Sequence, residues 1–433
     1  MTETRLAGLS LRKNIAWISM GEGVDLVSQW GLLAVLSKFM DVTAVGLFGL
    51  ALAVIGPITE FCDLGLRKAQ ATDVGGEYRF GHYFSLRIVT SSVAFLVIVT
   101  IASTLGIGVY GWTVILLMAL ARAIEGQSDV FHGLFQLNSR MDFIARARML
   151  RGPLGLTLFT AGIYFTGDQR VGSLGLIVAA LTVLLLYDRR LGARLLMRPR
   201  PGQASAPATA EPGPGDAIAF VWNTRQMASL VRQVFPLGLV AVLGSLQMNI
   251  PRYSVELHQG MAALGYFTAL TALYSASTRM ANAMGHSAAA SMAHGFAADA
   301  RRTVLVLLAK LGILGLLLGA AGIAVVWAMG QEILTLIYAP EYAEYAHILL
   351  LLMVAAAFRH LGSMWQIGII AARQFRVHLV QHVANIAVAA VASVLLIPPY
   401  GLLGAAFVLI AVAATNLVFV MAANAIFLRR LSG

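Results

Sequence analysis

Long apolar stretches alternate with short polar connections along almost the whole chain. A helix needs about 20 mostly apolar residues to cross the ~30 Å hydrocarbon core of a bilayer. The pattern therefore predicts an all-α polytopic membrane protein with about twelve transmembrane helices. They are expected at residues 14–36, 45–66, 86–107, 110–135, 151–166, 171–188, 231–255, 263–285, 303–329, 345–371, 377–398 and 401–428.

Composition agrees with a membrane protein. Apolar residues make up 59% of the chain and charged residues only 12%, and the mean hydropathy is +0.79. An ordinary soluble domain is about 25% charged. The single cysteine, Cys62, excludes a disulfide within the chain. The first apolar stretch is too long and too acidic for a signal peptide, so we expect it to be a retained span.

The basic residues set the orientation. With the N-terminus in the cytoplasm, the external connections carry only Lys38, Arg170 and Arg252, and most of the 31 Lys and Arg residues fall in cytoplasmic connections. This is the positive-inside pattern. It predicts that both termini are cytoplasmic, and it explains the net charge of +11 without a nucleic-acid partner.

A segment rich in Pro, Ala and Gly, RPRPGQASAPATAEPGPGD, divides the spans into two groups of six. Such a segment can bury no core, and it predicts a flexible cytoplasmic linker at 198–216. The lobes would be 1–197 and 217–433, in the same orientation, as in transporters built from parallel repeats. The stretches LNSRMDF and AARQF, after the fourth and tenth spans, favour duplication, although common loop composition gives the same similarity.

Polar residues recur at helical spacing inside several spans, although an Arg, Lys or Asp at mid-membrane costs roughly 2.5–3.5 kcal/mol. The stripes are Glu22, Asp25 and Gln29; Arg122, Glu125 and Asp129; Thr271, Ser275, Arg279, Asn282 and His286; and Arg359, Ser363 and Gln366. Two interpretations are open. The stripes are either ion pairs and hydrogen bonds that hold helices together, or the lining of a hydrated central cavity between the lobes.

The distribution of charge favours the cavity. Intramembrane acids cluster in the first half, at Glu22, Asp25, Glu60, Asp63, Glu125 and Asp129, whereas the spans of the second half carry Arg279 and Arg359. Structural pairing does not predict basic groups without acids in the same half, but an anionic ligand does. Glu60 and Asp63 are expected merely to offset the neighbouring Arg67 and Lys68.

Sequence signatures of enzymes and cofactor sites are missing. The chain has no G-x-x-x-x-G-K-[ST] stretch, no H-E-x-x-H and no pair of cysteines. His378 and His382 lie four residues apart, which we interpret as part of a polar seam rather than a metal site. The short external connections leave little room for a catalytic domain. We therefore expect a transporter, with no enzymatic activity, no cofactor and no metal.

The segment NIPRYSVELHQGMAALGYFTAL, residues 249–270, resembles the polysaccharide-flippase (Wzx-type O-antigen or exopolysaccharide) branch of the multidrug/oligosaccharidyl-lipid/polysaccharide exporter superfamily. That branch carries Asn-x-Pro-Arg-Tyr at the end of span seven, then Gly, and Leu-Gly-x-Phe at the start of span eight. The matching residues are Asn249, Pro251, Arg252, Tyr253, Gly260, Leu264, Gly265 and Phe267. The stretches FCDLGLRKA, LTLIYAPEYAEYAHILLLL and IPPYGLLGAAFVLIA also resemble the family.

The resemblance implies a two-lobed, alternating-access flippase of the bacterial inner membrane. Its passenger would be an oligosaccharide on a polyprenyl pyrophosphate, carried from the cytoplasmic to the outer face. Arginine offers permanent charge and bidentate hydrogen bonds to phosphate. The hypothesis is that Arg122, Arg279, Arg359, Asn282 and Arg252 bind the passenger. Arg252 can also pair with Glu256 four residues later, either as a gate or as a helix cap.

Energy would come from an ion gradient, because one charge crossing 100 mV yields roughly 2.3 kcal/mol. Glu22, Asp25 and Glu125 are the candidates for binding H⁺ or Na⁺. Other expected partners are membrane lipids and proteins of polysaccharide assembly. Two other functions remain open: a small-molecule or drug cation antiporter of the same superfamily, whose cavity should favour acids over arginines, and a membrane enzyme of glycan assembly.

Overall fold

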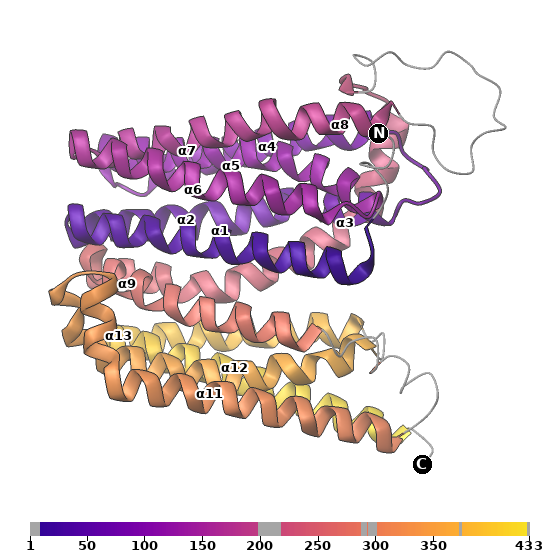
Figure 1. The fold of residues 1–433 in the computed structure, drawn as a ribbon. Helices are drawn as coiled ribbons and strands as arrows, with labels where there is room; N and C mark the ends of the chain where they lie inside the picture. The colour runs from indigo at the N-terminus through magenta and orange to yellow at the C-terminus, as the bar shows by residue number, and fades with distance from the viewer. Residues whose placement is uncertain (1–8, 198–217, 287–291, 293–300, 372–374, 431–433) are drawn as a thin grey trace. The chain divides into compact units, whose positions relative to one another are not determined.

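The computed structural model describes residues 9–197, 218–286, 292, 301–371 and 375–430. These residues form helices and their connecting turns, and they contain no strand (Figure 1). The helices, in chain order, are α1 (Leu11–Phe39), α2 (Val42–Cys62), α3 (Leu66–Thr72), α4 (Phe80–Thr104), α5 (Gly108–Leu137), α6 (Met141–Thr166), α7 (Gln169–Val183), the π-helix η2 (Leu184–Asp188), α8 (Arg189–Leu196), α9 (Thr224–His286), α11 (Arg301–Ile337), the 3₁₀-helix η4 (Pro340–Tyr345), α12 (Ala346–Ala371) and α13 (Phe375–Arg430).

The helices confirm the pattern of twelve spans. Eight helical stretches are long and apolar enough to cross a membrane. Two of them, α9 and α13, each contain two spans, which meet at Gly260 (φ 81°) and Gly401 (φ 55°). A positive φ at these turns suits glycine because it has no Cβ. The more polar α1 and α6 complete the set.

The fifth span begins earlier than hydropathy predicts, at Met141 rather than near residue 151. The extra turns are polar, so they carry no apolar signal. Asp142 lies in the first turn, where a negative charge suits the helix dipole. Its carboxylate also pairs with Arg140 at 2.7 Å and with Arg146 at 3.8 Å. These local ion pairs explain why the helix continues through a charged segment.

Asp168 forms the start of the next span. Its side chain accepts a hydrogen bond from the backbone N–H of Arg170 at 2.8 Å and pairs with the Arg170 guanidinium at 2.6 Å. The side-chain hydrogen bond from Arg170 is the main reason that the pKa of Asp168 lies below its ordinary value. Both contacts fix the helix N-terminus, as expected for an Asp N-cap.

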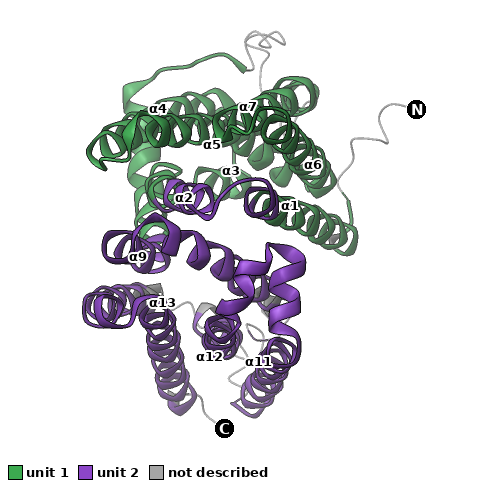
Figure 2. Ribbon diagram, turned by 90° about the vertical axis from the view of Figure 1, so that its left-hand side faces the viewer, with its two compact units in different colours: residues 1–32, 54–242 green, residues 33–53, 243–433 purple. Residues whose placement is uncertain are grey.

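The chain forms two compact units (Figure 2). Unit 1 consists of residues 1–32 and 54–242, and unit 2 of residues 33–53 and 243–433. The segment 33–53, which contains the end of α1 and the first half of α2, thus belongs with helices from the second half of the chain. The division of the sequence into lobes at the linker stays a prediction, and that linker lies outside the described residues.

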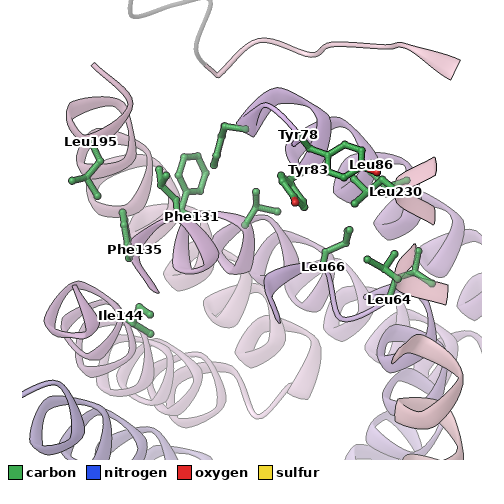
Figure 3. Close-up of a cluster of buried hydrophobic side chains, with 14 of the residues drawn as sticks. Leu64, Leu66, Tyr78, Tyr83, Leu86, Phe131, Phe135, Ile144, Leu195 and Leu230 are labelled. Carbon is green, nitrogen blue, oxygen red and sulfur yellow. The ribbon is translucent and has the colours of Figure 1, made fainter. Parts of the chain in front are cut away.

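Unit 1 has an apolar core at the end of its bundle where α3, α4, α5 and α8 meet (Figure 3). Phe131 and Phe135 project from α5, Leu195 comes from α8, and Leu66 from α3. All four side chains are at least 94% buried. This core holds α8 against α5 and thereby fixes the neighbouring charged groups.

In unit 2 the backbones of α2 and α9 approach closely at glycines. A Cβ on Gly265 would lie 2.1 Å from the carbonyl oxygen of Val42, and a Cβ on Gly46 would lie 2.0 Å from that of Met261. No side chain can turn away to relieve these contacts, because the obstacles are backbone atoms. Small residues permit such close approach of membrane helices. The Gly of the Leu-Gly-x-Phe motif therefore has a packing role.

Gly265→Ala is expected to destabilise the protein by about 1–3 kcal/mol, the usual range for overpacking. Thermal unfolding of the purified protein in detergent measures the effect. Gly23→Ala is the matched control, since Gly23 lies within α1 and a Cβ there meets nothing within 4 Å. An unchanged melting temperature for Gly265→Ala would show that α2 and α9 can move apart without loss of stability.

Candidate functional site

The predicted polar stripes of unit 1 meet one another. Arg122 pairs with Glu125 at 3.1 Å, and Arg151 of α6 pairs with the same carboxylate at 3.7 Å. Arg151 also lies 3.5 Å from Asp25 of α1, which accepts a hydrogen bond from Gln29 at 2.8 Å. Three of the predicted residues, Asp25, Arg122 and Glu125, therefore belong to one ionic chain that crosses α1, α5 and α6.

Glu22 lies next to this chain and pairs with Arg148 at 3.1 Å. Its side chain is 56% exposed, whereas that of Asp25 is only 19% exposed. Sequence reasoning assigned Arg148 and Arg151 to a cytoplasmic loop and so did not expect them to contact acids of the first span. Both lie on α6, one turn apart, which lets them face α1.

A second ionic cluster forms where α3, α4 and α5 meet. Arg87 of α4 pairs with Asp63 and lies 4.0 Å from Asp129, while Arg67 lies 3.9 Å from Asp129. The expectation that Asp63 offsets Arg67 is wrong, because each residue has a partner on another helix. Arg87, which sequence reasoning counted as a loop charge, is only 1% exposed.

Arg122 also borders a small pocket between α2, α4 and α5. The pocket has about 260 Å³ of empty space, including its opening. It is lined by Thr59, Cys62, Asp63, Ser91, Ala94, Phe95, Ile98, Ala119, Arg122 and Ala123. Glu60, one residue away from this lining, is exposed and forms no ion pair with Lys68. The two residues still interact electrostatically, so the offset of Lys68 by Glu60 stays a prediction.

Arg252 occupies a different environment in unit 2. Its guanidinium donates to the Asn249 side-chain oxygen at 3.1 Å and to the Thr271 hydroxyl at 3.3 Å. The anticipated pair with Glu256 does not form, because Arg252 turns toward Thr271 on the second half of α9. Thr271 belongs to the predicted polar stripe of the eighth span. The guanidinium of Arg252, from the seventh span, therefore hydrogen-bonds to this stripe.

Arg359 of α12 approaches the same stretch of α9. Its half-buried guanidinium lies close enough to the Tyr274 phenol to interact with it electrostatically. Tyr274 and Thr271 are three residues apart and hence neighbours on the helix surface. Arg252 therefore donates a hydrogen bond to one residue of α9, Thr271, and Arg359 interacts electrostatically with another residue one turn away, Tyr274.

Neither arginine of this pair has a carboxylate within 4.0 Å among the described residues. Among the described residues of unit 2, the carboxylates are Asp41, Glu256, Glu332, Glu341 and Glu344. All five are exposed or half-buried and lie near helix ends. Neutral groups can accept hydrogen bonds from a guanidinium but cannot balance its charge. Arg252 and Arg359 are therefore suited to receive an anion.

Two further predicted residues lie near the end of α9. Arg279 is exposed, two turns beyond Thr271 on the same helix. The side chain of Asn282 lies outside the described residues. Of the predicted substrate-binding residues, Arg122 belongs to unit 1, and Arg252, Arg279 and Arg359 belong to unit 2.

Unit 2 contains a cluster of buried amide side chains that the sequence analysis did not predict. Gln381 donates to Gln366 at 2.8 Å and to the Asn416 side-chain oxygen at 2.5 Å, and Asn385 donates to that oxygen at 3.1 Å. The sequence offered two hints: Gln366 in the predicted polar stripe with Arg359 and Ser363, and the polar seam around His382, one residue from Gln381. No three His, Cys, Asp or Glu side chains come close enough to hold a metal within the described residues.

Known proteins with similar sequences and folds were compared with the chain. No family model matches it. It is 22% identical over 394 residues to the capsular polysaccharide biosynthesis protein CapF of Staphylococcus aureus, covering 91% of this chain and 94% of CapF. It superposes on the lipid II flippase MurJ in an inward closed conformation with a TM-score of 0.73 and 8% identity, over 94% of this chain and 87% of MurJ.

Multidrug transporters share the same architecture. An inward-facing MATE family transporter of the MOP superfamily matches with a TM-score of 0.66 and 14% identity, over 98% of this chain and 95% of its own. The chain has the MOP superfamily fold. A MOP superfamily transporter from Pyrococcus furiosus also matches, with a TM-score of 0.61 and 13% identity, over 100% of this chain and 98% of its own.

The MOP fold confirms the family resemblance seen around Pro251 and Arg252, and with it the twelve-helix, two-lobed architecture. Together with the eight long apolar helical stretches, this fold confirms a multi-pass membrane protein. The central cavity between lobes stays a prediction. So do the predicted roles of the individual site residues.

Proposed function

We propose that this MOP superfamily protein is a flippase for a polyprenyl-pyrophosphate-linked oligosaccharide. It moves the passenger from the cytoplasmic to the outer leaflet of the bacterial inner membrane by alternating access between two lobes, with both termini in the cytoplasm. The observation that carries the proposal is the pair Arg252 and Arg359, two cations of a membrane-spanning unit that have no carboxylate within 4.0 Å among the described residues. Arg252 instead donates hydrogen bonds to the neutral side chains of Asn249 and Thr271. The likeness to CapF, a capsular polysaccharide biosynthesis protein, supports the glycan as passenger.

Arg252 and Arg359 are the leading groups for the pyrophosphate in this proposal. A bidentate guanidinium matches phosphate oxygens in geometry and in charge. Arg279 and Asn282 continue the same polar stripe of α9 and would contact the passenger farther along it. Arg122 has a weaker claim, because Glu125 already pairs with it at 3.1 Å.

An ion gradient would drive the cycle through Glu22, Asp25 or Glu125. Each of these carboxylates now has an arginine partner, so binding H⁺ or Na⁺ would weaken an ion pair. Such competition converts ion binding into a change of helix contacts between α1, α5 and α6. Transport in proteoliposomes should therefore respond to an imposed pH or Na⁺ gradient, and indifference to both would remove these residues from the cycle.

Deleting the gene should abolish surface glycan and leave lipid-linked oligosaccharide on the cytoplasmic leaflet, and a plasmid copy should restore export. Leaflet position is measured by accessibility of the intermediate to an added glycosidase in intact spheroplasts. Loss of drug resistance with normal surface glycan would instead identify a drug antiporter. Loss of the lipid-linked intermediate itself would indicate an enzyme of glycan assembly.

A further inference from the structure

Three ionisable side chains that the proposed transport does not use meet at one end of unit 1. His132 projects from α5 between Asp129, one turn earlier, and Asp188, the last residue of η2. Its Nδ1 lies 3.6 Å from an Asp129 carboxylate oxygen, and its Nε2 lies 3.5 Å from an oxygen of Asp188. The His132 side chain is 3% exposed, and that of Asp188 is fully buried.

The hydrogen-bonding capacity of these groups is unfilled. Neither His132 ring nitrogen and neither Asp188 carboxylate oxygen has a hydrogen-bond partner among the described residues. A buried carboxylate without a partner is strongly destabilising. A neutral imidazole has one N–H, so it can serve only one of its two acidic neighbours, whereas an imidazolium has two. The geometry therefore suits a doubly protonated ring.

The net charge of the groups around the ring also favours a doubly protonated His132. The groups connected to it are Asp63, Arg67, Arg87, Asp129 and Asp188. Two arginines face three carboxylates, which leaves one negative charge in a largely buried cluster. A proton on His132 makes the cluster neutral.

Other charged groups on the surrounding helices have partners of their own or lie at the surface. From α5, Arg122 interacts electrostatically with Asp63 and Asp129, but it is itself paired with Glu125 at 3.1 Å. From α6, Arg140 and Arg146 share the carboxylate of Asp142, and the surplus positive charge lies on Arg146, whose side chain is 49% exposed. From η2, the half-buried Tyr187 adds a neutral phenol whose hydroxyl is buried. From α8, Arg189 and Arg190 are exposed to solvent. Arg67 of α3 and Arg87 of α4 are already counted.

The position of Asp188 links this charge to backbone structure. Asp188 ends a five-residue π-helix between α7 and α8. π-Helical turns are rare in proteins overall, and many of those that occur lie at functional sites. Just beyond it, Gly192 of α8 lies so close to the Phe131 ring that a Cβ would meet the ring at 2.4 Å. Phe131 precedes His132, so the apolar contact and the ionic contact hold the same turn against α5.

We propose that His132 is a proton-binding site: one proton, exchanged with solvent, bridges Asp129 and Asp188 and holds the η2–α8 turn against α5. When the proton leaves, Asp188 becomes an unpaired buried anion and the turn is released. The inference concerns unit 1 alone and stands whatever the passenger is.

Thermal unfolding of the full-length protein between about pH 5 and pH 9 tests the proposal. The sign is fixed, because a protonated histidine between carboxylates stabilises the fold at low pH and this stability is lost as the pH rises. The wild type should therefore lose several °C of melting temperature toward high pH. His132→Asn should lose that dependence and melt at a lower temperature throughout. His258→Asn, at an exposed histidine of unit 2, is the matched control and should retain it.

A second variant separates protonation from a general packing defect. Asp188→Asn removes one carboxylate, so the cluster is neutral without a proton on His132, and its melting temperature should vary less with pH. The double variant His132→Asn/Asp188→Asn should melt above His132→Asn alone. Equal pH dependence in the wild type and His132→Asn would overturn the proposal, as would a double variant no more stable than His132→Asn.

Discussion

Arg252→Gln and Arg359→Gln are each expected to lose most surface glycan while the protein remains in the membrane at its normal level. A charge-assisted hydrogen bond contributes about 1.5–3 kcal/mol. Removing one guanidinium should therefore reduce export about 10- to 100-fold, if the arginine binds the passenger. Glutamine can still bond to the neutral groups around each site, such as Asn249 and Thr271 beside Arg252. The fold should therefore survive.

The measurement is surface glycan at matched protein levels in a strain that lacks the chromosomal copy. Arg252→Lys and Arg359→Lys should fall between the wild type and the Gln variants, since lysine keeps the charge but loses bidentate bonding. Arg302→Gln is the matched control, because Arg302 is an exposed arginine of the same unit at the start of α11. Normal glycan in both Gln variants would remove Arg252 and Arg359 from the passenger site.

Arg87→Met is expected to cause the largest loss of stability of any single change in unit 1. The Arg87 side chain is 2% exposed and pairs with Asp63 and Asp129. Removing one partner of a buried ion pair typically costs about 3–5 kcal/mol, because the other charge stays buried. The melting temperature and the yield in detergent should both fall sharply.

The double variant Asp63→Asn/Arg87→Met should recover part of this loss, since the main carboxylate partner is neutralised. Arg170→Gln is the matched control: its ion pair with Asp168 is exposed, and exposed pairs contribute little. A double variant as unstable as Arg87→Met alone would show that the arginine acts through packing rather than charge.

Hydropathy predicted the spans well because each span is an independent, local property of the sequence. The breaks at Gly260 and Gly401 lie where apolar stretches meet. Gly260 falls in the predicted connection between two spans, and Gly401 is the first residue of the predicted twelfth span. The start of α6 was missed for the converse reason. Its first turns are charged, and their stability comes from ion pairs at Asp142 that no local average can register.

The pairing of the intramembrane charges was far less predictable. Helical spacing correctly joined Arg122 to Glu125, three residues apart. The partners of Asp63 and Asp25 lie 24 and 126 residues away along the chain, so only the folded structure identifies them. Asp129 and His132 were within reach of a spacing argument, but the third member, Asp188, was hidden beside a cytoplasmic run of arginines.

Binding of a short-chain polyprenyl pyrophosphate to the purified protein in nanodiscs tests the central claim most directly: the arginines of unit 2 hold an anionic passenger. The wild type should bind the pyrophosphate and not the corresponding polyprenol. The double variant Arg252→Gln/Arg359→Gln should bind it at least about 100-fold more weakly, as expected for two lost charge-assisted contacts. Equal affinity in the wild type and the double variant would contradict the claim.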